Sequence, residues 1–298
     1  MQIDDTFLEL SHNKALAWRK HAGASFLLKE DYMALIKVNE VNLNYEQSGQ
    51  GEAIVFLHGF TGSHDDWRYQ MAAVKDRFRG IALDLRGHGK SAAPANEDEY
   101  SIYLNCEDVR SLLTKLGISR CCLVGHSMGG FTAIQFALDN PSMLWGLVLV
   151  DTSSGEWETV PGYAELRAKL DELARTEGLE TAFAYDAGNN PVRIERFKKQ
   201  PEQREIARKK TLSTSVDAYV YVPRSFGKWQ SVTGRLGEIK VPTIIFRGED
   251  DAGFVRASNI LKESIAGSEL VVVPGAYHNP HEEAPEYFND YFLKFLNR

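Results

Sequence analysis

Residues 121–129 read Cys-Cys-Leu-Val-Gly-His-Ser-Met-Gly, and this stretch decides the fold. Four apolar residues predict a buried strand, and the pattern Gly-x-Ser-x-Gly follows at once. From Met128 to Leu138 apolar residues recur with helical spacing, until Asn140-Pro141 ends the pattern. A serine in such a sharp strand-to-helix turn is lifted out of the sheet, and the flanking glycines avoid collisions with neighbouring backbone. We therefore predict that Ser127 is a nucleophile; the alternative is a glycine-rich turn with an incidental serine.

Similar apolar runs recur along the chain and are separated by stretches with helical periodicity. The predicted strands are 54–57, 81–83, 121–124, 147–150, 243–246 and 270–273. They are almost wholly apolar, as expected when helices cover both faces of a parallel sheet. The chain is therefore predicted to be an α/β protein with a mostly parallel, twisted sheet flanked by helices.

The strand rhythm stops after Asp151 and resumes at Val241-Pro242. The residues between them carry charged helical patterns, such as 163–176 and 202–212, and predict a helical insertion above the carboxyl edge of the sheet. The predicted divisions are an N-terminal extension (1–36), a first core segment (37–151), the insertion (152–236) and a second core segment (237–298). Within the extension, the first 32 residues are predicted to form an appended helix or a segment dispensable for folding.

The composition is ordinary for a soluble globular protein. The 298 residues carry a formal charge of -7 with a pI near 5.7, which gives no general attraction to nucleic acid or anionic lipid. The basic run at Arg204, Arg208, Lys209 and Lys210 is predicted to be the solvated face of a helix. The N-terminus is acidic where a signal peptide would be basic, and no apolar run approaches ~20 residues. We expect a cytoplasmic monomer or homodimer with a small-molecule substrate.

The three cysteines give no sign of a disulfide framework or a metal site. Cys106, Cys121 and Cys122 form no CxxC pair and have no zinc-type spacing with histidine. Because Cys121 and Cys122 stand in an apolar run, their thiols are expected to behave as small buried hydrophobic groups.

A second loop is placed to supply backbone donors. Residues 58–62 read His-Gly-Phe-Thr-Gly directly after the strand that ends at Leu57. Acyl transfer passes through a tetrahedral oxyanion, which needs N–H donors aimed at it. The N–H groups of Met128, the residue after the serine, and of Phe60 are the predicted pair. A tight turn without a donor role is the alternative for this loop.

A serine hydroxyl needs a base, and position decides among the eight histidines. His278 follows the strand 270–273 and would lie at the same sheet edge as Ser127. His281 is the main competitor, although Pro280 and the residues after it already have the pattern of a first helical turn. We therefore predict that His278 is the general base.

The residue that orients this histidine should follow the strand 243–246. There the sequence offers three carboxylates in a row, Glu249, Asp250 and Asp251. Only one of them needs to lie against the histidine, where it fixes the tautomer and stabilises the imidazolium. Asp251 is our choice and Asp250 the alternative, since spacing alone does not separate them.

Five segments in this order resemble the α/β-hydrolase superfamily, from about Asn39 to the C-terminus. They are HGFTG (58–62), LDLRGHGKS (83–91), GHSMGG (125–130), Gly-x-x-Asp (248–251) and residues 274–285. The family pattern puts the acid at the last position of Gly-x-x-Asp, which supports Asp251. It implies that the insertion 152–236 is a helical cap over the site, and that Asp84 and Arg86 brace loops. A serine at position 127 excludes the dehalogenase and epoxide-hydrolase branches, whose chemistry requires an aspartate there.

The resemblance implies a capped serine hydrolase of the carboxylesterase or C–C hydrolase-like branch. The expected reaction is hydrolysis of a small or medium carboxylic ester through an acyl-enzyme, with no metal or organic cofactor. HGFTGS and the histidine loop are also similar to C–C bond hydrolases and to the lyase of menaquinone biosynthesis. A non-catalytic ligand receptor with an intact triad is a further alternative.

Substrate contacts are expected in the insertion, but packing is the commoner role of its aromatic residues. The aromatic residues in question are Trp157, Tyr163, Phe183, Tyr185, Tyr219, Tyr221, Phe226 and Trp229. Arg224 could bind a substrate carboxylate, although an exposed arginine with no such role is the default expectation.

Overall fold

The computed structural model describes residues 32–155 and 162–298, in which eight strands form a single sheet. The appended helix proposed for the first 32 residues falls almost wholly outside the described residues. The strands are β1 (Tyr32–Val38), β2 (Val41–Ser48), β3 (Ala53–Leu57), β4 (Arg79–Leu83), β5 (Cys121–His126), β6 (Leu144–Val150), β7 (Thr243–Gly248) and β8 (Glu269–Val273). Their order is β1-β2-β4-β3-β5-β6-β7-β8. Only β1–β2 and β2–β4 pair antiparallel, so the predicted α/β fold with a mostly parallel sheet is confirmed.

The antiparallel hairpin β1–β2 has a sequence pattern unlike that of the other strands. Burial alternates along β1, and polar residues such as Asn42 and Asn44 interrupt β2. β1 therefore has one solvated face, whereas β2 is mostly buried and includes buried polar residues such as Asn44, so β2 does not form a continuous apolar run. The turn between the two strands places Asn39 and Glu40 at positive φ, 41° and 68°.

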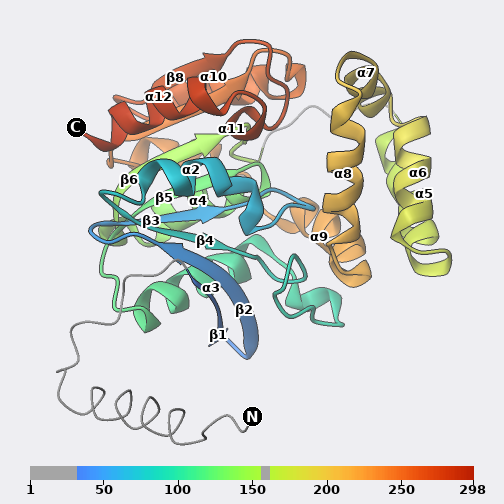
Figure 1. Ribbon diagram of the computed structural model, residues 1–298, viewed down its shortest axis with the longest axis horizontal. Helices are drawn as coiled ribbons and strands as arrows, with labels where there is room; N and C mark the ends of the chain where they lie inside the picture. Colours follow the sequence, from blue (N-terminus) through green and yellow to red (C-terminus); the bar gives the residue numbers. More distant parts are fainter. Residues whose placement is uncertain (1–31, 156–161) are drawn as a thin grey trace, which may run out of the picture. The chain divides into compact units, whose positions relative to one another are not determined.

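Helices cover both faces of the sheet (Figure 1). They are α2 (Arg68–Val74), α3 (Ile102–Lys115), α4 (Met128–Asp139), α10 (Val255–Ser264), α11 (Pro280–Glu283) and α12 (Pro285–Leu296). Short 3-10 turns complete the core at η1 (His64–Trp67), η2 (Glu97–Glu99), η3 (Pro141–Met143), η4 (Thr233–Glu238) and η5 (Ala252–Phe254). One buried cluster joins the sheet to α3, α4 and α10, and the other joins it to α2 and α12. The helix α3 ends at Lys115, and Gly117 follows at a positive φ of 66°.

The carboxyl ends of the central strands are level with one another. Leu57 of β3 pairs with Gly125 of β5, His126 pairs with Val150 of β6, and Val150 pairs with Phe246 of β7. The loops that follow these strands therefore leave the sheet at one edge. Ligands of open parallel sheets bind at this carboxyl edge.

Between β6 and β7 the described residues form a group of helices, which we call the inserted helices. They are α5 (Tyr163–Thr176), α6 (Leu179–Asn189), α7 (Pro191–Lys199), α8 (Glu202–Leu212) and α9 (Val216–Lys228). Figure 1 shows them beyond the carboxyl ends of β3 and β6. They share a small apolar cluster that includes Leu170, Leu173, Ala182 and Val220. The sequence patterns at 163–176 and 202–212 correspond to α5 and α8.

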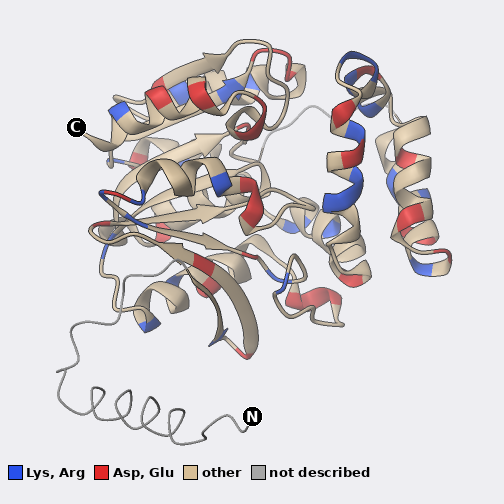
Figure 2. Cartoon of the chain, viewed as in Figure 1, with Lys and Arg blue, Asp and Glu red and all other residues tan. Residues whose placement is uncertain are grey.

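Ion pairs join the inserted helices to the core, and charges of both signs stand on α7 and α8 (Figure 2). Lys210 of α8 lies 3.0 Å from Asp66 of η1 and also pairs with Glu282 of α11. Arg196 of α7 pairs with Glu283, the next residue of α11. Lys210 was expected on a solvated face, but its side chain is only 18% exposed. No helix of the described residues is long and apolar enough to cross a membrane.

Candidate active site

Ser127 occupies the turn between β5 and α4 with a backbone geometry that serine rarely adopts. Its φ is 50° and its ψ is -113°. The Ser127 N–H donates to the Val150 carbonyl at 2.9 Å, and Thr152 Oγ1 donates to the Ser127 carbonyl at 2.8 Å. These bonds hold a conformation that costs on the order of 1–3 kcal/mol. The side chain is thereby presented at the carboxyl edge of the sheet, as the sequence pattern predicts.

The two glycines of the turn are required by close backbone contacts. A Cβ on Gly125 would lie 2.3 Å from the Gly129 carbonyl oxygen. A Cβ on Gly129 would lie 2.3 Å from the Leu57 carbonyl oxygen. The elbow therefore packs directly against the end of β3, and the loop that follows β3 is brought next to the serine.

Two backbone donors stand in the segments that border Ser127. In the described part of the chain, the N–H groups of Met128 and Phe60 donate to no protein acceptor. Met128 begins α4, and Phe60 belongs to the loop whose Gly59 lies against the elbow, since a Cβ on Gly59 would be 3.2 Å from Ser127 Cβ. Backbone N–H donors of this kind, unpaired and next to a candidate nucleophile, are what an oxyanion-binding site requires.

His278 and Asp251 form a hydrogen-bonded pair. His278 Nδ1 lies 2.6 Å from Asp251 Oδ2, and the ring of Phe254 is 4.9 Å from the imidazole. Because a carboxylate only accepts, Nδ1 carries the proton and Nε2 is left as the basic nitrogen. Burial alone would raise the pKa of Asp251, but the adjacent His278 outweighs it and lowers that pKa, so Asp251 is ionised. Asp250, the alternative acid, is exposed, and the carboxylate bonded to His278 Nδ1 is that of Asp251.

His281, the alternative base, lies in a different environment. It is fully buried, and its ring stacks on Trp67 with centroids 4.3 Å apart. Burial lowers the pKa of His281 to about 3, so it is neutral at any ordinary pH. The structure therefore places His278, and not His281, beside the acid.

His126 connects the serine turn to the histidine loop. Its Nε2 donates to the His278 carbonyl at 2.6 Å, and the two rings are 4.9 Å apart. Burial holds the pKa of His126 well below its usual range, so the ring is neutral. The residue before Ser127 thus fixes the backbone of His278, a contact that the sequence alone did not indicate.

A further carboxyl group, that of Asp151, lies next to the His278–Asp251 pair. One ligand atom from each of the three residues lies within 4.8 Å of the other two. Within this group, the hydrogen bond between His278 Nδ1 and Asp251 joins two of the three residues directly. Asp151 marked only the end of the strand rhythm in the sequence; its position directly after β6 is the signal that could have found it.

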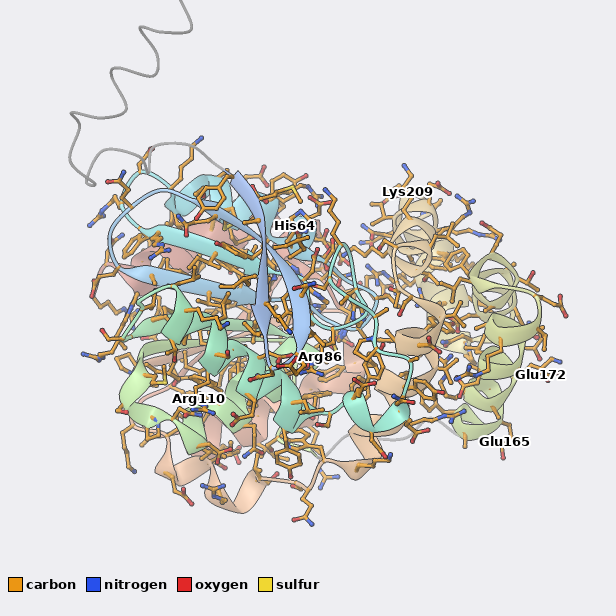
Figure 3. All side chains as sticks on the ribbon, turned by 90° about the horizontal axis from the view of Figure 1, so that it is seen from below. His64, Arg86, Arg110, Glu165, Glu172 and Lys209 are labelled. Carbon is orange, nitrogen blue, oxygen red and sulfur yellow. The ribbon has the colours of Figure 1, made fainter. Side chains whose placement is uncertain are left out.

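Asp84 and Arg86 brace loops, which is the role that the family resemblance implies. Asp84 Oδ1 accepts from the backbone N–H of His64 at 2.7 Å and lies 2.8 Å from its Nδ1. Arg86 binds both oxygens of Asp108 on α3, at 2.5 and 2.9 Å. Figure 3 shows the labelled Arg86 beside the green helices of the core, and the next residue, Gly87, accepts a hydrogen bond from the Ser215 N–H just before α9 at 2.8 Å.

Aromatic residues of the inserted helices pack against the donor loop and α4. The Phe60 ring is 5.7 Å from that of Tyr219 and 6.3 Å from that of Phe226, and Trp229 stacks on Phe131 at 5.3 Å. Tyr219 and Trp229 are buried by these contacts. Trp157 lies outside the described residues. Arg224 pairs with Asp171 and Glu97 at the surface, so its guanidinium is already engaged.

Comparison with known proteins gives the same fold and several enzyme types. The family described as "alpha/beta hydrolase fold" matches residues 52–285. A putative 2-succinyl-6-hydroxy-2,4-cyclohexadiene-1-carboxylate synthase of Bacillus subtilis is 30% identical over 263 residues, 84% of this chain and 92% of the relative. Epoxide hydrolase 4 of Mus musculus is 33% identical over 301 residues, 88% of this chain and 78% of the relative. A thermophilic esterase from Thermogutta terrifontis is 27% identical with a TM-score of 0.78, over 89% of this chain and 98% of that one. The sheet order, the serine turn and the match over residues 52–285 together establish that this chain belongs to the α/β-hydrolase fold family.

Proposed function

We propose that the protein is a serine hydrolase that cleaves a small or medium carboxylic ester through an acyl-enzyme. The observation that carries this proposal is the 2.6 Å pair of His278 and Asp251, tied through His126 to the strained turn of Ser127. A nucleophile, a base and an orienting acid that converge at one sheet edge are what acyl transfer needs.

In the proposed mechanism, His278 Nε2 takes the proton of Ser127 Oγ as the oxygen attacks the ester carbonyl carbon. The new C–O bond turns the carbonyl into an oxyanion, which the N–H groups of Phe60 and Met128 stabilise. The protonated His278 then gives its proton to the departing alkoxide, and the C–O bond to the alcohol breaks. Water repeats the steps on the acyl-enzyme and regenerates Ser127.

The two backbone donors are expected to supply a large part of the rate enhancement. Removing one donor from a site of this type costs about 3 kcal/mol in the transition state. Phe60 and Met128 suit this role because their N–H groups have no other acceptor in the described residues. The donors are backbone groups on elements fixed by close packing, so little reorganisation accompanies the reaction.

The charges around the site favour an uncharged substrate. Arg196 and Lys210 reach from the inserted helices towards the histidine loop, and each is already paired with a carboxylate there. Lys199 of α7 also approaches this loop, with its ammonium 5.6 Å from the centre of the Tyr277 ring. A dicarboxylic substrate would have to break the pairs of Arg196 and Lys210 to gain either cation as a partner. An ester with no charge near the reacting bond meets no such cost. We propose that the inserted helices act as a cap that excludes water over Ser127.

Epoxide opening is disfavoured by the chemistry of serine. Several relatives are named epoxide hydrolases. An aspartate that opens an epoxide forms an ester, which water can hydrolyse at its carbonyl carbon. Ser127 would form an ether instead, and no water step available to His278 would release it. The serine therefore supports carbonyl chemistry in this chain.

The second candidate is a C–C bond hydrolase or a lyase of the menaquinone-pathway type. The likeness to the putative Bacillus subtilis synthase favours it, since that relative covers nearly the whole of both chains. In this reading Ser127 and His278 promote cleavage or elimination on a conjugated carboxylic substrate. The paired state of Arg196 and Lys210 argues against it, because neither cation can bind a substrate carboxylate without leaving its own carboxylate partner.

The test is hydrolysis of p-nitrophenyl esters, from acetate to dodecanoate, by wild type, Ser127→Ala and His278→Ala. Ser142→Ala is the matched control, because Ser142 is exposed in η3 at the far end of α4. We expect both site variants to lose roughly 10⁴-fold or more in kcat and the control to lose nothing. The chain-length profile would then measure the depth of the acyl pocket.

Three results would contradict the ester proposal. If folded wild type releases no p-nitrophenol, a conjugated dicarboxylic substrate should be assayed next. A single slow turnover with a retained ligand would indicate the receptor alternative. Turnover that survives Ser127→Ala would remove the serine from the mechanism.

A further inference from the structure

Asp151 is a buried acid that the proposed mechanism does not use. It follows β6, which lies between β5 with Ser127 and β7 with the Asp251 loop. Asp151 is 1% exposed and has a positive φ of 39°. Its N–H donates to the Phe246 carbonyl of β7 at 2.9 Å. The backbone therefore turns sharply at this residue, and its carboxyl group is held inside the edge of the sheet.

The carboxyl group of Asp151 has two kinds of neighbour. The Gly248 N–H donates to both of its oxygens, at 3.2 and 3.1 Å. The second neighbour is the carboxylate of Asp251. One oxygen of Asp151, one oxygen of Asp251 and one ring nitrogen of His278 all lie within 4.8 Å of one another. One backbone N–H is weak compensation for a buried negative charge.

Two carboxyl groups this close do not both ionise in a buried site. Burial and the adjacent Asp251 raise the pKa of Asp151 well above its ordinary value, and Glu283 adds to that effect. His278, Asp151 and Arg196 act in the opposite direction on Asp251 and lower its pKa. The proton of the pair is therefore on Asp151, and the charge is on Asp251.

We propose that Asp151 is a positioning residue: its protonated carboxyl group donates a hydrogen bond to the ionised Asp251 and holds it in line with His278. The proposal rests on the serine-hydrolase function proposed above for Asp251 and His278. The ionised Asp251 thus accepts two hydrogen bonds, one from the Asp151 O–H and one from the His278 Nδ1–H. A donor on Asp251 also lowers its basicity, which limits how strongly it holds the imidazolium.

The test compares two substitutions in the full chain. Asp151→Asn keeps an acceptor for the Gly248 N–H and a neutral donor for Asp251, but it can never carry charge. Asp151→Leu has a similar size and can do neither. Asp186→Asn is the control for neutralising a buried aspartate elsewhere, since Asp186 is 5% exposed on α6. Thermal unfolding and circular dichroism would confirm that each variant is folded.

We expect Asp151→Asn to stay within about threefold of wild-type kcat, and Asp151→Leu to lose about tenfold or more with little change in KM. Without its donor, Asp251 becomes more basic and holds the charged His278 more firmly. The acid limb of the kcat/KM profile of Asp151→Leu should therefore move to higher pH by roughly half a unit or more, while that of Asp151→Asn stays in place. If the substitution only disturbed packing, kcat/KM would fall at every pH and the acid limb of its pH profile would stay in place.

The proposal is overturned if Asp151→Asn is as impaired as Asp151→Leu, because the residue would then act as a charge. It is also overturned if the limb does not move in Asp151→Leu. An NMR titration of the labelled His278 ring gives the same comparison without turnover. If wild type hydrolyses no ester, the ester function fails, and this titration still decides whether Asp151 acts on the Asp251–His278 pair.

Discussion

At the scale of single residues, the site is marked by backbone strain at the ends of two neighbouring strands. Ser127 after β5 and Asp151 after β6 both have positive φ, and each donates its N–H to a carbonyl of the next strand. The ladder therefore continues one residue beyond each strand and turns these side chains towards the carboxyl edge. Strain of this kind persists only where the surroundings determine the conformation. Ser127 was predictable from its glycines, whereas for Asp151 the sequence offered only its place directly after a strand, because its partner lies 100 residues away in sequence.

The close approach of α4 to β3 leads to a prediction about stability. In Gly129→Ala the new Cβ would lie 2.3 Å from the Leu57 carbonyl oxygen, so backbone must move. We expect a loss of about 1–3 kcal/mol in the free energy of unfolding, measured by urea denaturation. Gly188→Ala on α6 is the control, because nothing lies within 4 Å of its Cβ, and it should gain about 0.5–1 kcal/mol. Equal stability of the two variants would contradict the packing described here.

At the scale of elements, sequence periodicity located what is locally determined. The helices α5 and α8 could be predicted because their charged helical pattern is visible within each segment alone. The parallel strands could be predicted because both of their faces are apolar. Periodicity did not find the strand β2 or the burial of the Lys210 side chain. Both depend on tertiary packing, which decides which residues meet solvent. The choice of His278 over His281 also needed the fold, since three residues separate a partly exposed loop position from the core.

The ion pair between α8 and η1 predicts a pH dependence of stability. Burial raises the pKa of Asp66 from 3.8 to about 6, although Lys210 works against the shift. The folded state then binds this proton more tightly than the unfolded state does, so the contribution of Asp66 to stability is lost as pH rises from about 4 to about 6. The free energy of unfolding of wild type, minus that of Asp66→Asn, should fall by on the order of 2 kcal/mol across this window.

Urea unfolding of both proteins at about pH 4 and about pH 7 measures this difference. Other groups titrate in the same range, but they do so in both proteins and cancel in the subtraction. A difference that stays constant, or that rises with pH, would show that Asp66 does not carry the raised pKa.

At the scale of the whole molecule, all eight strands and the site residues lie within residues 32–298, which form one compact unit by their contacts. We therefore predict that a chain starting at Tyr32 folds with a free energy of unfolding within about 0.5 kcal/mol of the full chain. It should also keep the ester hydrolysis that we propose for the full chain. The start at Tyr32 retains β1 intact. An insoluble or unfolded product, at matched expression and temperature, would contradict the prediction and show that residues 1–31 are needed for folding.

The inserted helices leave the sheet after β6 and return to β7, its immediate neighbour. A parallel pair of strands always needs a crossover, so the insertion only lengthens a connection that the fold must make. The entropic penalty of such lengthening grows slowly, by about 0.6 kcal/mol for each doubling. In evolutionary terms, we therefore expect the inserted helices to be an exchangeable module, subject to the anchors at Arg196 and Lys210. Residues 162–236 could then change to meet new compounds while the carboxyl edge of the sheet stays the same.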